Sequence, residues 1–137
     1  MFLGEYQHSL DAKGRVILPS RYRARFGEGL VVTKGQTGCL YVYPREEFER
    51  VAQSLIDANK RDLARHFFSG SSEDAPDGQG RVGIPESLRR YAGLDRDVTV
   101  IGNGNRMEIW DRSRWESHRE QTEPEYSGMA DDPNVRF

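Results

Sequence analysis

Short apolar runs separated by glycine, proline and polar residues predict a chain built mainly from β-strands. Residues 30–33 and 40–43 flank a glycine-bearing turn, which is the pattern of a β-hairpin. Residues 98–101 and 107–110 flank a second turn of the same kind. The chain is therefore expected to contain two hairpins of similar design.

A shorter apolar run precedes each hairpin and stops at a proline. These runs are residues 16–18, which end at Pro19, and residues 82–84, which end at Pro85. Because proline has no N–H to donate to a strand ladder, each run predicts a short strand that ends at that point. Each half of the chain thus opens with a strand.

A short helix is expected after each of these prolines. The first covers residues 21–26, where Ser20 can cap the N-terminus and Gly27 can close the C-terminus. The second covers residues 88–92 and is closed by Gly93. The two halves therefore share the order strand, short helix and hairpin.

A longer helix is expected after each hairpin. In the first half Pro44 suits the first helical turn, and the helix should reach about Asn59. Its apolar positions recur at helical spacing: Phe48, Val51, Ala52 and Leu55. In the second half Asp111 can cap the corresponding helix. Residues 121–137 lack hydrophobic periodicity and carry acidic residues, so we expect them to form a flexible tail.

This order of elements repeats because the sequence itself is duplicated. The motif D-x-x-G-R-V-x-x-P occupies residues 11–19 and recurs 66 residues later, at residues 77–85. The period exceeds the roughly 20–50 residues of solenoid repeats, so we interpret the chain as two copies of a small domain. We place them at residues 1–69 and 70–120, before the tail of residues 121–137. The predicted fold is α+β and β-rich.

The composition favours halves that share one core. The chain has 137 residues, of which 36% are hydrophobic and 31% are charged. Each half alone is smaller than most independently stable domains, so we also expect burial between copies of the chain in a homo-oligomer. No apolar segment is long enough to span a bilayer. Cys39 is the only cysteine and is expected to be buried, and the protein is expected to be cytoplasmic.

The duplicated loop carries the leading candidates for a binding site. Its turn-forming residues are Asp11 and Gly14 in the first copy and Asp77 and Gly80 in the second, ahead of Arg15 and Arg81 respectively. Each arginine on its own is explained as a solvated charge at a strand start. Duplication, however, would place both on one pseudo-symmetric surface, and a guanidinium group can hold a phosphate or a guanine edge bidentately.

The pattern does not predict an enzyme. Residues 78–83 match the letters of the dinucleotide-binding fingerprint, but polar residues precede them and the third glycine lies in a strand that ends at Pro85. The three histidines are scattered without the spacing of metal ligands. We expect no catalytic residue, metal, cofactor, small-molecule substrate or membrane partner.

The repeated loop followed by a small basic helix resembles the AbrB/SpoVT DNA-binding domain. Two such copies, with Met1–Gly4 at the start and Phe67–Gly70 before the second copy, resemble the MraZ family over residues 1–120. The resemblance implies a swapped-hairpin β-barrel flanked by helices, with chains assembled head to tail into rings. It also implies a nucleoid-associated bacterial regulator that binds repeats upstream of its own gene, in the division and cell wall cluster.

The DNA-contacting arginine of that family falls on Arg15 and Arg81. We therefore predict that both contact double-stranded DNA, with phosphate contacts from Lys13, Arg21 and Arg23. The net charge of −2 does not exclude this, because residues 1–27 are locally basic. Head-to-tail assembly predicts direct repeats in the operator. The main alternative is a non-enzymatic oligomeric scaffold or antitoxin-like module that binds protein partners.

Overall fold

A computed structural model describes residues 1–27 and 29–137. Within them, a six-stranded antiparallel sheet has the order β1-β7-β8-β4-β3-β5, and a second sheet pairs β2 with β6. The strands are β1 Glu5–Ser9, β2 Arg15–Ile17, β3 Leu30–Lys34, β4 Leu40–Pro44, β5 Ser72–Asp74, β6 Arg81–Gly83, β7 Asp97–Asn103 and β8 Arg106–Asp111. The predicted α+β, β-rich class is confirmed.

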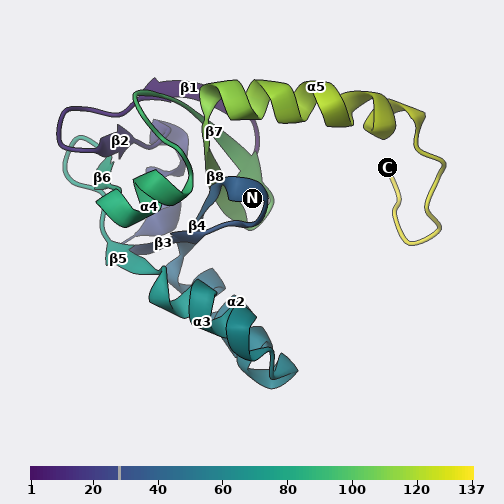
Figure 1. Ribbon diagram of the computed structural model, residues 1–137, viewed down its shortest axis with the longest axis horizontal. Helices are drawn as coiled ribbons and strands as arrows, with labels where there is room; N and C mark the ends of the chain where they lie inside the picture. The colour runs from purple at the N-terminus through teal and green to yellow at the C-terminus, as the bar shows by residue number, and fades with distance from the viewer. Residues whose placement is uncertain (28) are drawn as a thin grey trace.

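Helices flank the sheets. They are η1 Ser20–Tyr22, α1 Arg23–Phe26, η2 Gln36–Gly38, α2 Arg45–Ala58, α3 Arg61–Ser69, α4 Glu86–Tyr91 and α5 Arg112–Gly128. Figure 1 shows α2 and α3 side by side, projecting from the sheet as a pair, while α5 extends from the body in another direction. The short helix α4 begins shortly after the end of β6 and packs against β3.

Both predicted hairpins are present. β3 pairs with β4 in the register that places Val32 opposite Val42. β7 pairs with β8 in the register that places Val100 opposite Ile109. All four of these side chains are buried, which explains why the apolar runs could be identified in the sequence.

The two halves exchange their first strands. β1, from the first half, pairs with β7 of the second half, and β5, from the second half, pairs with β3 of the first. β5 lies just after the boundary between the halves, where no strand was expected from the sequence, so the expected opening of the second half at residues 82–84 is corrected. Its polar residues pair through the backbone and leave no alternating apolar signal.

The larger sheet is open, because β1 and β5 form its two edges in the described part of the chain. The closed barrel that the family resemblance implies is therefore not confirmed. The exchange of first strands nevertheless joins the halves extensively, since each half completes the sheet of the other. The two copies of the domain cannot be separated without removing an edge strand from each hairpin.

The helix ends correct two local predictions. Ser20 does not cap the first short helix, because a 3-10 turn begins at Ser20 itself, and no side chain of the described residues caps the N-terminus of that turn. Asp111 does cap α5, by accepting a hydrogen bond from the Arg114 N–H at 3.1 Å. However, α5 continues to Gly128 and includes Pro124, so residues 121–128 are helical, not a flexible tail. That part of α5 is largely exposed and needs no apolar periodicity.

A single core joins the two halves, as predicted. Its buried side chains come from both copies and include Val16, Leu18, Leu30, Val32, Leu40, Val82, Ile84, Leu88, Val98, Val100, Met107 and Ile109. Phe2 is also fully buried, and its ring packs against those of Tyr22 and Phe26. This shared core fixes the small sheet of β2 and β6, and therefore fixes the loops that precede these strands.

Candidate nucleic-acid interface

The loop before β2 is closed by the side chain of Asp11. Its Oδ1 atom accepts hydrogen bonds from the backbone N–H groups of Lys13 and Arg15, both at 2.9 Å. Its Oδ2 atom accepts from Nε of Arg15 at 2.7 Å. Asp11 therefore holds both the loop backbone and the guanidinium group of Arg15.

The loop before β6 repeats this geometry. Oδ1 of Asp77 accepts from the N–H groups of Gln79 and Arg81, both at 2.9 Å, and Oδ2 accepts from Nε of Arg81 at 2.6 Å. Gly14 and Gly80 occupy equivalent places with φ of 73° and 78°, a region that glycine adopts readily. The duplicated motif thus builds two equivalent turns.

Both aspartates remain ionised at neutral pH. The hydrogen bond from the Arg15 backbone is the largest cause that holds the pKa of Asp11 below its usual value. The corresponding bond from Arg81 lowers the pKa of Asp77 to about 2. Each carboxylate therefore keeps its charge and continues to fix its arginine over the physiological range.

The strand pairing turns both arginines outward. Val16 lies opposite Val82 in the β2–β6 ladder, and both valines are buried. Because side chains alternate across a strand, Arg15 and Arg81 project from the opposite face. They are diagonal neighbours in this ladder, a relationship that places such residues about 7–8 Å apart.

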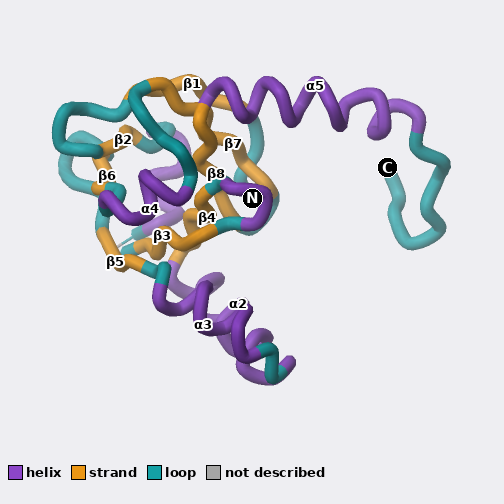
Figure 2. Tube along the Cα trace, in the orientation of Figure 1, coloured by secondary structure: helices purple, strands orange, loops and turns teal. Residues whose placement is uncertain are grey.

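Backbone bonds join the loops across this ladder. Leu18 N donates to Gly80 O at 3.0 Å, and Ile84 N donates to Gly14 O at 2.9 Å. Figure 2 shows both loops as neighbouring coil segments, at the end of the molecule away from the C-terminal segment. The structure thus brings Arg15 and Arg81 together on one surface, as the duplication suggests.

Within residues 1–27 and 29–137, each guanidinium group forms a hydrogen bond through one nitrogen. Nε of Arg15 and of Arg81 bonds its aspartate, whereas their terminal nitrogens have no hydrogen-bond partner among residues 1–27 and 29–137. The side chains are 27% and 31% exposed. Each arginine is therefore held in one orientation while its terminal nitrogens remain available to an external acceptor.

A second pair of arginines supports the loops from the opposite half. Arg23, at the start of α1, lies against Gly80, where a Cβ atom would be only 2.1 Å from its Nε. Arg89, in α4, lies against Gly14, where a Cβ atom would be 2.7 Å from its Cζ. Arg23 also donates to Leu18 O at 3.3 Å. Sequence reasoning did not include Arg89 in the site, although Arg89 follows Arg23 by the 66-residue repeat.

The remaining predicted phosphate-binding residues differ in their surroundings. Lys13 is exposed within the first loop. Arg21 is exposed on η1, with its guanidinium 5.0 Å from the centre of the Tyr22 ring. Arg23 is half-buried beneath Gly80 and is thus both a support and a cation near the surface. The neighbouring Arg25 pairs with Glu46.

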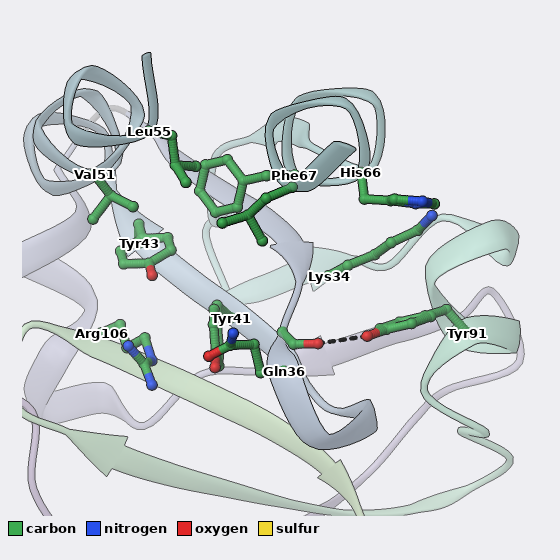
Figure 3. A pocket seen from close by; sticks show the side chains of 12 residues that line it. Lys34, Gln36, Tyr41, Tyr43, Val51, Leu55, His66, Phe67, Tyr91 and Arg106 are labelled. Atoms are coloured by element: carbon green, nitrogen blue, oxygen red, sulfur yellow. Dashed lines mark hydrogen bonds between the residues drawn. The ribbon is translucent and has the colours of Figure 1, made fainter. Parts of the chain in front are cut away.

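An apolar groove lies away from the arginine loops. This cavity, of about 510 Å³, is bordered by β4 and by α2 and α3. Figure 3 shows Tyr41 and Tyr43 on the strand facing Leu55 and Phe67 on the helices. At its edge the Tyr91 hydroxyl donates to Gly35 O at 2.5 Å. The groove and the arginine loops have different chemistry and are separate surfaces.

Cys39 is buried, as predicted, with only 1% of its surface exposed. Burial is the main cause that raises the pKa of its thiol to about 12, with a smaller contribution from the charge of Glu108. The thiol is therefore protonated at neutral pH and is a poor nucleophile. In the described residues, no helix combines the length and hydropathy required to span a membrane.

Comparison with known proteins identifies the family. The family model described as MraZ protein, which its description also calls antitoxin-like, matches residues 1–66 and again residues 67–132. The chain belongs to the MraZ family. Each MraZ match contains one arginine loop, with Arg15 in the first and Arg81 in the second.

Several MraZ relatives are similar over nearly their full length. A protein of Heliobacterium modesticaldum named transcriptional regulator MraZ is 46% identical over 136 residues, covering 96% of this chain and 95% of the relative. The protein of the same name from Kocuria rhizophila is 50% identical, covering 93% of this chain and 92% of the relative. The one from Micrococcus luteus is 49% identical, covering 96% of each chain.

Proposed function

We propose that this MraZ chain is a sequence-specific DNA-binding transcription regulator. The observation that carries the proposal is the pair of outward-facing arginines, Arg15 and Arg81, each fixed through Nε by an ionised aspartate. A fixed guanidinium loses little further side-chain freedom on binding, and its terminal nitrogens can bond the O6 and N7 atoms of guanine. The names of the relatives agree with this role.

The surrounding cations supply the sequence-independent part of the binding. Lys13, Arg21 and Arg23 contact phosphates on either side of the bases that the loops approach. Arg23 has a second task, because it supports the loop of the opposite half through Gly80. The local positive charge of this surface attracts DNA although the whole chain has a net charge of −2.

The operator consists of direct repeats upstream of the chain's own gene, in the division and cell wall cluster. Direct repeats follow from head-to-tail assembly of chains into a ring, because successive subunits then present their loops in the same orientation. Exposed apolar residues on the projecting helix pair support such assembly: Ile56, Leu63 and Phe68. Such a regulator acts in the cytoplasm, associated with the nucleoid, and is not an enzyme.

The alternative function, a scaffold or antitoxin-like module, is favoured by the apolar groove beside α2 and α3. The two functions make different demands on the arginine loops. A scaffold that uses the groove does not need Arg15 or Arg81, whereas a DNA-binding regulator does. Substitution of the loop arginines therefore separates the two.

The test measures binding of duplex DNA from the region upstream of the gene, with a scrambled duplex of equal length as reference. Replacement of Arg15 or Arg81 by alanine should weaken specific binding by about 1–3 kcal/mol each. Arg65→Ala is the matched control, because Arg65 is an exposed arginine on α3 that pairs with Asp62, a neighbour on the same helix. Wild-type affinity in a folded Arg15→Ala, Arg81→Ala double variant would overturn the proposal.

A further inference from the structure

Ile17 is an apolar side chain on the face that carries the two arginines. It follows the buried Val16 in β2, so its side chain alternates to the outward face, and it is 42% exposed. In the ladder Ile17 lies directly opposite Arg81. Cβ atoms of directly opposed residues are about 4.5–5.5 Å apart, so Ile17 lies beside the stem of Arg81.

The equivalent position in the other half has no side chain. Gly83 follows Ile17 by the 66-residue repeat and lies directly opposite Arg15. Its backbone N–H donates to Oδ2 of Asp74 at 2.9 Å, so a carboxylate borders this side of the surface. The two arginines are therefore equivalent in their loops but have different neighbours: Arg81 has an isoleucine and Arg15 has a glycine.

The difference between isoleucine and glycine at these positions changes which bases each half can contact in the major groove of DNA. The C5-methyl group of thymine is the apolar feature that a base pair presents there, and apolar side chains contact it. The base pair next to a contacted guanine is about 3.4 Å further along the helix. That step is comparable to the spacing between Ile17 and Arg81, so an arginine and an isoleucine in this relationship match two successive base pairs.

We propose that Ile17 is a specificity-determining residue that contacts the C5-methyl group of a thymine beside the guanine bound by Arg81. This inference rests on the proposed DNA-binding function and adds a second base to the site. Arg81 and Ile17 together read a two-base step, whereas Arg15, opposite Gly83, reads one base. The two halves of one subunit therefore have different sequence preferences.

The experiment replaces each thymine of the duplex from the region upstream of the gene, one at a time, by deoxyuridine, which lacks only the C5-methyl group. Removal of one buried methyl contact should weaken wild-type binding about fourfold at a single position. Ile17→Ala should bind all these duplexes alike, and Ile17→Val should retain the sensitivity. The sensitive thymine should adjoin the base whose recognition is lost in Arg81→Ala but kept in Arg15→Ala.

Controls separate this inference from the function on which it rests. Lys13→Ala should weaken binding to every duplex equally and keep the sensitivity to deoxyuridine. If the arginine variants lose binding but Ile17→Ala keeps the wild-type pattern, or if the wild type is sensitive at no thymine, the role of Ile17 is overturned. If the arginine double variant binds as the wild type does, the DNA-binding function itself fails.

Discussion

The guanidinium group of Arg89, in the second half of the chain, packs directly on Gly14 in the loop of the first half. A Cβ atom at Gly14 would lie 2.7 Å from Cζ and 2.8 Å from Nη1 of Arg89. Nε of Arg89 is buried without a hydrogen-bond partner among residues 1–27 and 29–137, so this arginine is held by packing. Arg23 and Gly80 form the equivalent contact, and each loop is therefore supported by the opposite half.

Gly14→Ala should destabilise the protein and weaken DNA binding. The residue has a φ of 73°, which costs a side chain with a Cβ atom about 1–2 kcal/mol, and the added methyl group would displace Arg89. Gly78→Ala is the control in the second loop, because Gly78 does not have a positive φ and its Cβ would meet no atom of residues 1–27 and 29–137 within 4 Å. Thermal unfolding measures the stability of both variants, and a binding titration measures their affinity for DNA. Equal stability of the two would contradict the packing argument.

The duplicated motif allowed the candidate site to be predicted from sequence, because loop and arginine occur in both copies. The two hairpins could also be predicted from sequence, because their buried residues form apolar runs. The exchange of first strands could not be predicted from sequence, because β1 and β5 are polar edge strands that pair through backbone atoms. The role of Arg89 depends on its packing against Gly14 of the other half, and its position in the repeat alone does not predict that packing.

The charge difference between the two loops predicts a pair of opposite effects. Lys13 is exposed in the first loop, and Gln79 occupies the same place in the second. Lys13→Ala should reduce the dependence of log K on log salt by about 0.9, and Gln79→Lys should increase it by the same amount, because each phosphate contact releases counterions. Affinities for specific and scrambled duplexes at several salt concentrations provide the measurement. Unchanged slopes in both variants would exclude phosphate contacts at these positions.

The lowered pKa of His8 predicts that the folded protein loses stability in mild acid. Burial in β1, and secondarily the charge of Arg112, lower the pKa of His8 below 6.5, and Arg112 also donates to the His8 carbonyl at 2.8 Å. The unfolded chain therefore binds a proton at a higher pH than the folded chain does. The stability associated with neutral His8 is present above pH 6.5 and is lost as the pH falls through the lowered pKa.

The control for this effect is His8→Gln, which cannot take up the proton. Urea unfolding at pH 7.5 and at pH 5 should show a smaller loss of stability in the variant than in the wild type. The partial exposure of His8 makes this difference modest. A larger loss in the variant would mean that His8 binds its proton more strongly in the folded protein than in the unfolded chain.

Removal of residues 121–137 should leave the fold intact and slightly strengthen DNA binding. The end of α5 is largely exposed, and Tyr126, Met129 and Phe137 are 67%, 69% and 100% exposed, so the segment contributes little to the core. It contains four acidic residues, Glu123, Glu125, Asp131 and Asp132, against one arginine, and this negative charge repels phosphate.

A second truncation, after Gly128, removes Asp131 and Asp132 but keeps the helix. The affinity gain should increase from the shorter to the longer deletion and should disappear at high salt, with the melting temperature nearly constant. A large fall in melting temperature in the longer deletion alone would show that residues 121–128 stabilise the body of the protein.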